Sequence, residues 1–247
     1  MTKILTELIE AGLNRVENSW RTPLALTILA AALLLQLQPV SAHNVSAADA
    51  ELIAGETGWH FLLYVWLGAK HMVTGYDHLL FLVGVIFYLR DLRTVAIFVS
   101  LFALGHSITL ICGVLFGLGV NAFLVDAIIG LSVAYKGFDN LKGFDTLFGE
   151  SPDERMAVFI FGLFHGLGLA TKIQDLGIAD DGLFANLVSF NLGVELGQMA
   201  ALIVILIVLR ALPAHSQGSR FGTLVNLGLV LAGFTLMGYQ LTLYFTT

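Results

Sequence analysis

Six long apolar runs, separated by short polar segments, occupy most of the chain after residue 57. Most of them come close to the roughly 20 helical residues needed to cross the hydrocarbon core of a bilayer. The pattern predicts an all-α fold, a polytopic membrane helix bundle with about six transmembrane helices after an N-terminal signal segment. The runs lie near residues 60–89, 94–119, 121–137, 156–173, 183–210 and 222–246.

The first 42 residues have the pattern of a targeting segment. Basic residues precede an apolar stretch over 23–37, and small residues lead up to Ala42, which suits signal-peptidase cleavage after that residue. The polar leader is long for a signal peptide, so an uncleaved signal anchor is the alternative. The predicted domains are 1–42, a signal peptide or signal anchor, 43–57, a polar periplasmic linker, and 58–247, a six-helix membrane domain.

Lys and Arg are distributed unevenly among the segments that connect the runs. Because cytoplasmic loops are enriched in these residues, the side with more of them is predicted to be inside. The bias predicts a multi-pass protein of the bacterial inner (cytoplasmic) membrane with a periplasmic mature N-terminus. The inner segments carry Arg90, Arg93, Lys136, Lys142, Arg155, Arg210 and Arg220, and the outer ones carry Lys70 and Lys172.

Composition agrees with a lipid bilayer as the main partner of this chain. Apolar residues make up 57% of the 247 residues and charged residues 12%, about half the charged fraction of a soluble domain. The formal net charge of −6 argues against nucleic acid as a partner, because nucleic-acid binding requires clustered Lys and Arg. The single cysteine, Cys112, excludes an internal disulfide and a cysteine-rich metal site.

A small set of ionisable side chains lies inside the apolar runs. Such groups are costly in hydrocarbon and are functional-site hypotheses by default. Imidazole and carboxylate together suit nickel, zinc, iron or copper better than calcium or magnesium. The candidate metal ligands are His71, Asp77, His78, His106, Asp126, His165 and Glu195, with Ser107, Thr109, Asn191 and Gln198 as supporting polar residues.

The spacing of these residues predicts their arrangement along the helices. On one continuous helix, His71 and His78 lie about 20° from each other and two turns apart. Asp77 points off that face, and is either a ligand toward a neighbouring helix or an acceptor that orients an imidazole. The candidate groups form a ladder that starts near the outer face and stops near the midplane. The fifth run adds one polar stripe made of Asn191, Glu195 and Gln198.

Glycines four residues apart recur in three of the runs. In lipid, small residues at this spacing allow two helices to approach closely. We interpret them as helix-packing surface. The pairs are Gly113 with Gly117, Gly162 with Gly166, and Gly193 with Gly197.

Four motifs in these runs resemble those of the HupE/UreJ family, in the family's order and over about residue 60 to the C-terminus. The resemblance implies a hydrogenase or urease accessory membrane protein of the nickel-permease type. The motifs are His71-x5-Asp77-His78, Gly105-His106-Ser107-Ile108-Thr109-Leu110, Phe161-Gly162-Leu163-Phe164-His165-Gly166-Leu167-Gly168 and Phe190-Asn191-Leu192-Gly193-Val194-Glu195-Leu196-Gly197-Gln198.

The resemblance also implies which residues handle metal. By motif, these are His71, Asp77, His78 and His165, and the branch of the family with the Asn-Leu-Gly-Val-Glu element adds His106 and Glu195. Two positions depart from the family's pattern. Asp126 stands where that branch often has Glu, and Leu169 and Ala170 follow Gly168 where the nickel-permease branch has a second histidine.

We expect the chain to be a permease or facilitator for a nickel-like transition metal ion, with zinc, iron or copper as alternatives to nickel. An integral-membrane metalloenzyme, either a metal-dependent hydrolase or an oxidoreductase, is the alternative for the same ligands. No catalytic residue is assigned. A metallochaperone that serves a metalloenzyme maturation partner is a third class, and a proton relay or structural hydrogen bonding would need no metal.

Overall fold

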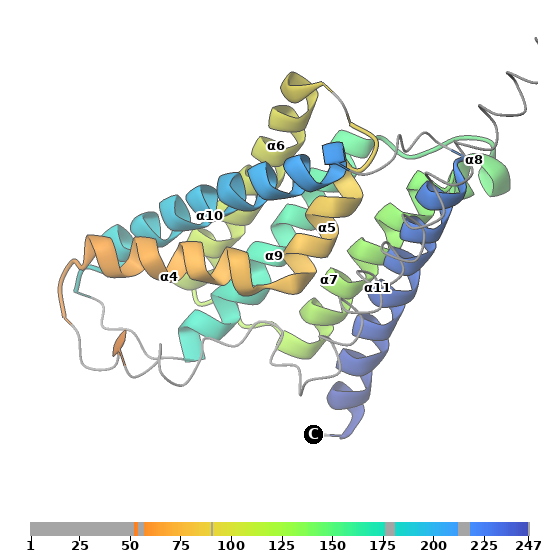
Figure 1. The fold of residues 1–247 in the computed structure, drawn as a ribbon. Helices are drawn as coiled ribbons and strands as arrows, with labels where there is room; N and C mark the ends of the chain where they lie inside the picture. The colour runs from red at the N-terminus through yellow and green to blue at the C-terminus, as the bar shows by residue number, and fades with distance from the viewer. Residues whose placement is uncertain (1–51, 54–56, 90, 176–180, 212–217, 247) are drawn as a thin grey trace, which may run out of the picture.

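The computed structural model describes residues 52–53, 57–89, 91–175, 181–211 and 218–246. The predicted signal segment and most of the predicted linker lie outside the described residues. The described part is helical and contains no strand, which confirms the all-α fold class (Figure 1). Its main helices are α4 (Phe61–Thr74), α5 (Tyr76–Ile86), α6 (Leu92–Leu115), α7 (Ala122–Asn140), α8 (Gly143–Phe148), α9 (Glu154–Asp175), α10 (Leu183–Ala211) and α11 (Arg220–Thr246).

The first apolar run forms two helices, and the break falls between His71 and His78, where the sequence analysis assumed one continuous helix. Gly75 separates α4 from α5 in an extended conformation, with φ of −75° and ψ of 93°. Just before it, the hydroxyl of Thr74 donates a 2.8 Å hydrogen bond to the carbonyl of Lys70, a bond that tends to bend a helix. Glycine has little preference for the helical conformation, so the chain can change direction here.

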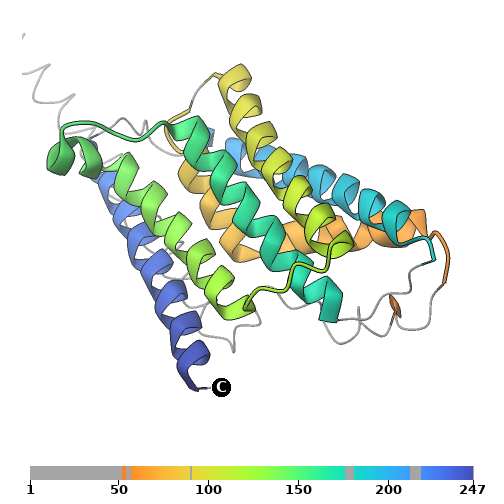
Figure 2. The ribbon, with the colours of Figure 1, turned by 180° about the vertical axis from the view of Figure 1, so that it is seen from behind.

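The helices associate in three tightly packed pairs: α4 with α10, α6 with α9, and α7 with α11 (Figures 1 and 2). Glycines make these close approaches possible. A side chain at Gly68 would meet the backbone of Phe190 and Val194, and one at Gly193 would meet the backbone of Val65. Farther along both helices, Gly197 lies against Ala69 and Met72, so α4 and α10 run parallel (Figure 1).

The glycines of the other two pairs play the same part. In the α6–α9 pair, Gly162 faces the backbone of Phe102, and Gly166 faces that of His106. In the antiparallel α7–α11 pair, Gly130, Gly137 and Gly233 lie against the partner's backbone. One expected glycine behaves differently. Gly117 has nothing within 4 Å and a φ of +61°, so it forms the turn after α6.

Four helices are long and apolar enough to cross a membrane, namely α6, α9, α10 and α11. Of the remaining helices in the described part, α5 is apolar but shorter, and the six-span count stays a prediction. Large apolar side chains also cover the outside, as with Ile203 and Ile207 on α10, which are 59% and 62% exposed. Apolar residues on both sides of a helix are typical of a membrane span.

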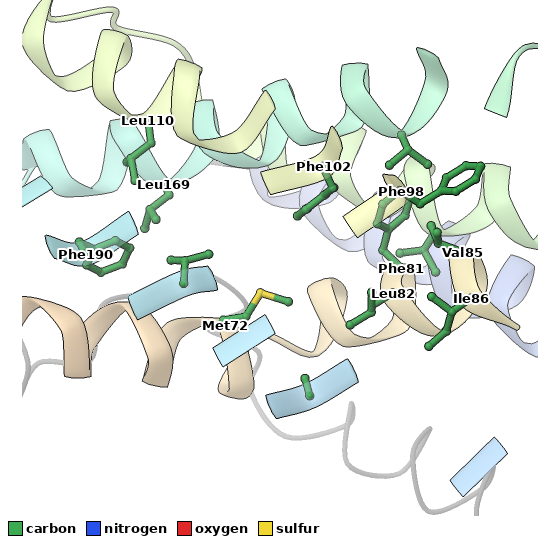
Figure 3. Packing of buried hydrophobic residues seen from close by; sticks show 14 of the residues in the cluster. Met72, Phe81, Leu82, Val85, Ile86, Phe98, Phe102, Leu110, Leu169 and Phe190 are labelled. Carbon is green, nitrogen blue, oxygen red and sulfur yellow. The ribbon is translucent and has the colours of Figure 1, made fainter. Parts of the chain in front are cut away.

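The apolar core lies where α5 meets α6, α9 and α10. Figure 3 shows Phe81, Val85, Phe98 and Phe102 packed together in this region, and all four are buried. The core is continuous with a cluster of histidines described below.

Charged residues gather at one end of the bundle. At one end, which we name the α8 end, α5, α7 and α10 finish and α6, α9 and α11 begin (Figure 1). Asp91 caps α6 there, and hydrogen bonds from Thr94 hold the pKa of its carboxyl below the usual value. Lys136, which the sequence analysis assigned to an inner connecting segment, is instead buried inside α7. Its charge is compensated by Asp139, 2.7 Å away, and by Glu154.

Candidate metal centre

The break at Gly75 determines the geometry of the first two histidines. In one continuous helix, seven residues would separate His71 and His78 by about 10 Å along the axis. In the structure their ring centroids are 5.1 Å apart. The expectation of a single face two turns long was therefore wrong, and the change of direction brings the two imidazoles closer than a continuous helix would.

His78 lies at the centre of a group of four histidines. Its ring centroid is 6.2 Å from that of His106 on α6 and 4.9 Å from that of His165 on α9. One ring nitrogen from each of His71, His78 and His106 lies within 4.8 Å of the others, an arrangement that can hold a metal ion. His78, His106 and His165 are at most 1% exposed. Three separate stretches of sequence thus supply one cluster.

Hydrogen bonds fix the orientation of two of these rings. The Nδ1 of His78 lies 2.9 Å from Oδ1 of Asp77, which also accepts the backbone N–H of His78 at 2.8 Å. The Nδ1 of His165 lies 2.7 Å from the carbonyl oxygen of Phe161. If each Nδ1 is the donor, each Nε2 keeps its lone pair, which is how metal-binding histidines are usually oriented. This geometry favours Asp77 as an orienting acceptor.

Several nitrogens of the cluster lack a hydrogen-bond partner among the described residues. They are both ring nitrogens of His106 and the Nε2 of His165, and all three are buried. Each buried polar atom without a partner costs about 1–3 kcal/mol, so such atoms call for an explanation. A neutral imidazole keeps one lone pair and one N–H, so a cation between the rings would satisfy the Nε2 of His165 and one nitrogen of His106, whose other nitrogen has the side chain of Asn191 nearby. The donor set therefore fits a transition metal ion.

Asp126, the predicted ligand on α7, has a cationic partner already. The Nζ of Lys172 donates to its two carboxylate oxygens at 2.8 and 3.1 Å. The sequence analysis counted Lys172 only as a charge in an outer segment. Its signal was available in the spacing, since Lys172 follows His165 by seven residues and shares its helix face.

The polar residues predicted to form one stripe on α10 are not all buried. Asn191 and Gln198 are buried, but Glu195 is exposed. Gly193 and Gly197 turn one side of α10 toward α4, and Glu195 lies away from that contact. The structure therefore does not bring Glu195 into the histidine cluster.

Ser107, a predicted supporting residue on α6, is half-buried.

Thr109 joins α6 to α9 rather than pointing into the cluster. Its hydroxyl donates to the carbonyl of Leu163 at 2.6 Å. We expect Thr109→Val to lower the free energy of unfolding by about 0.5–1 kcal/mol, because one interhelical hydrogen bond is lost. Thermal unfolding in detergent measures this loss. Metal affinity should stay unchanged, and an altered affinity would show that Thr109 belongs to the metal centre.

A narrow cavity begins at His78 and extends toward the α8 end. Two of its lining residues, His78 and Gln198, are polar, and the rest are apolar. Val85 near the end of α5 and Val158 near the start of α9 line its far part. The wall is completed by Met72, Phe81, Leu82, Phe98, Val99 and Phe102.

Comparison with known proteins decides the family. The family model described as HupE / UreJ protein matches residues 47–247, which is most of the chain. The chain belongs to the HupE/UreJ family. This confirms the resemblance seen in the four motifs. No curated protein and no solved structure matches the chain. For this HupE/UreJ protein, a role in nickel or other metal handling agrees with the histidine cluster.

Proposed function

We propose that this chain is a permease for a nickel-like transition metal ion. The observation that carries the proposal is the group of His71, His78 and His106, whose ligand atoms lie within 4.8 Å of one another. His165 extends the group, with its ring centroid 4.9 Å from that of His78. Neutral imidazoles bind nickel, zinc, copper and iron, and nickel is the ion that the family suggests.

The cavity beside His78 supports transport over catalysis. A ladder of ligands that stops near the midplane would suit a metalloenzyme, because an ion needs a way out as well as a way in. The cavity continues from His78 past Val85 and Val158 toward the α8 end. By the distribution of Lys and Arg, that end faces the cytoplasm and the opposite end faces the periplasm. The ion would enter at the histidines and leave through this cavity.

The test is to separate binding from flux in reconstituted vesicles. Val158 is 2% exposed and lines the cavity, whereas Ile160 on the same helix is 40% exposed. We expect Val158→Phe to fill the cavity and reduce Ni²⁺ uptake by roughly tenfold or more, with binding stoichiometry retained, as a closed path to the exit would do. Ile160→Phe is the matched control and should transport like the parent protein.

Two results would contradict the proposal. If the parent protein binds Ni²⁺ in a fixed stoichiometry but vesicles show no uptake, the metal stays in the site, and a metalloenzyme or a metallochaperone explains the residues better. If the parent protein binds no nickel, zinc, copper or iron, the histidines are not a metal site.

A further inference from the structure

The ion pair between Lys172 and Asp126 lies inside the protein. Both carboxylate oxygens of Asp126 accept hydrogen bonds from the ammonium, at 2.8 and 3.1 Å. The side chains of Lys172 and Asp126 are 11% and 8% exposed. A buried ion pair is costly to assemble, and it is often no more stabilising than apolar residues of the same volume. Stability of the fold therefore does not explain why a lysine and an aspartate occupy these two positions.

The pair lies close to the histidine cluster. Helix α7 packs against α9, and a Cβ at Gly168, three residues after His165, would lie 3.6 Å from Oδ1 of Asp126. The positive charge of Lys172 also acts on His71. Asp126 is the fifth residue of α7, and Lys172 is near the end of α9, so both lie toward the end opposite α8. The cavity leaves the cluster in the other direction. The ion pair therefore stands on the side from which the ion would enter.

The charges suggest what the pair does. A divalent cation at the histidines would be attracted by the negative carboxylates of Asp77 and Asp126. Lys172 neutralises Asp126, and its own positive charge repels the cation. An ammonium and a metal ion cannot both lie next to one carboxylate without repulsion. Lysine has a long, flexible stem, and its ammonium readily reaches water from a helix end. Lys172 is already partly exposed and lies within a turn of the end of α9.

We propose that Lys172 is a tethered counter-cation that Asp126 exchanges for the incoming metal ion. Before binding, Lys172 neutralises Asp126. When the metal ion enters, the ammonium moves toward water and Asp126 turns to the metal. When the ion leaves through the cavity, Lys172 returns and neutralises Asp126 again. The exchange lowers the affinity of the site and makes release easier. This inference rests on the proposed function and assigns to Lys172 a role in setting the affinity of that site.

Two substitutions of Lys172 should change Ni²⁺ affinity in opposite directions. Lys172→Met removes the competing charge, so the Kd for Ni²⁺ should fall by about tenfold or more, the scale of one close charge interaction. Lys172→Arg keeps the charge and holds the carboxylate with two parallel hydrogen bonds. The Kd should therefore rise by roughly threefold or more in this variant. Equilibrium titration of the purified full chain with Ni²⁺ measures both values.

The chain offers a matched control in its other buried lysine. Lys136 donates to Asp139 at 2.7 Å, and both side chains are 5% exposed, but the pair lies near the α8 end. Lys136→Arg should leave the Kd unchanged. Lys172→Arg preserves both charges, so it keeps the test decisive if Lys172→Met does not fold.

The outcomes distinguish this inference from the proposed function. If the parent protein binds Ni²⁺ and Lys172→Arg binds it with the parent's Kd, the pair is only structural and the counter-cation role is wrong, while the metal site stands. A Kd that rises in Lys172→Met would overturn the role in the same way. If the parent protein binds none of nickel, zinc, copper and iron, both proposals fall together.

Discussion

Replacing His78 by alanine should weaken Ni²⁺ binding by roughly 100-fold or more, which corresponds to about 2.7 kcal/mol. His78 is central to the cluster, with ring centroids 5.1 Å from His71, 6.2 Å from His106 and 4.9 Å from His165. Its loss would leave the other three imidazoles without their common neighbour. Metal content by elemental analysis and titration of the purified protein measure the effect.

The control for this variant is a histidine outside the cluster. His60 precedes α4 and makes a 3.0 Å hydrogen bond with the carbonyl of Thr57. His60→Ala should bind Ni²⁺ like the parent protein. If His78→Ala keeps the parent's affinity and stoichiometry while remaining folded, the metal is bound elsewhere and the proposed centre is wrong.

Replacing Gly68 by leucine should prevent stable folding, with a loss of about 3 kcal/mol or more in the free energy of unfolding. A Cβ at this position would meet the carbonyl group of Phe190 and, at 2.9 Å, the backbone nitrogen of Val194. These neighbours are backbone atoms of α10, which cannot rotate away as a side chain can. The parallel pair of α4 and α10 would have to separate. Thermal unfolding and size-exclusion elution in detergent measure the loss.

A glycine in open space provides the comparison. Gly238 in α11 has nothing within 4 Å of its position for a Cβ. Gly238→Ala should be neutral, or should stabilise the protein by up to about 1 kcal/mol, because alanine favours the helix. A folded Gly68→Leu variant with the parent's unfolding temperature would show that the α4–α10 contact is looser than described.

Local sequence patterns were sufficient to predict most of the helices. The apolar runs near 94–119, 183–210 and 222–246 correspond to α6, α10 and α11. A helix in lipid satisfies its own backbone hydrogen bonds, so a long apolar run is enough to predict one. The gathering of His71, His78, His106 and His165 was also expected, since buried ionisable groups in lipid are stable only near one another. Their role as ligands stays a prediction.

Two features of the centre were not predicted in this way. The change of direction at Gly75 depends on how α4 packs against α10, and a single glycine is also compatible with a continuous helix. The partner of Asp126 was missed because Lys172 was counted only as a charge of a predicted outer segment, and not by the helix face that it shares with His165. Both features depend on contacts between distant parts of the chain, such as α7 with α9.

The change of direction at Gly75 also places the first two histidines on two helices that pack against different neighbours. His71 belongs to α4, which is held against α10 through Gly68 and Gly193, whereas His78 belongs to α5, which packs on α7. At the proposed site, an ion bound by both rings would link the two helices, so its affinity would depend on the angle between α4 and α5. Bilayer thickness alters the tilt of long helices such as α10. Bilayer thickness would then influence how tightly the proposed site holds its ion.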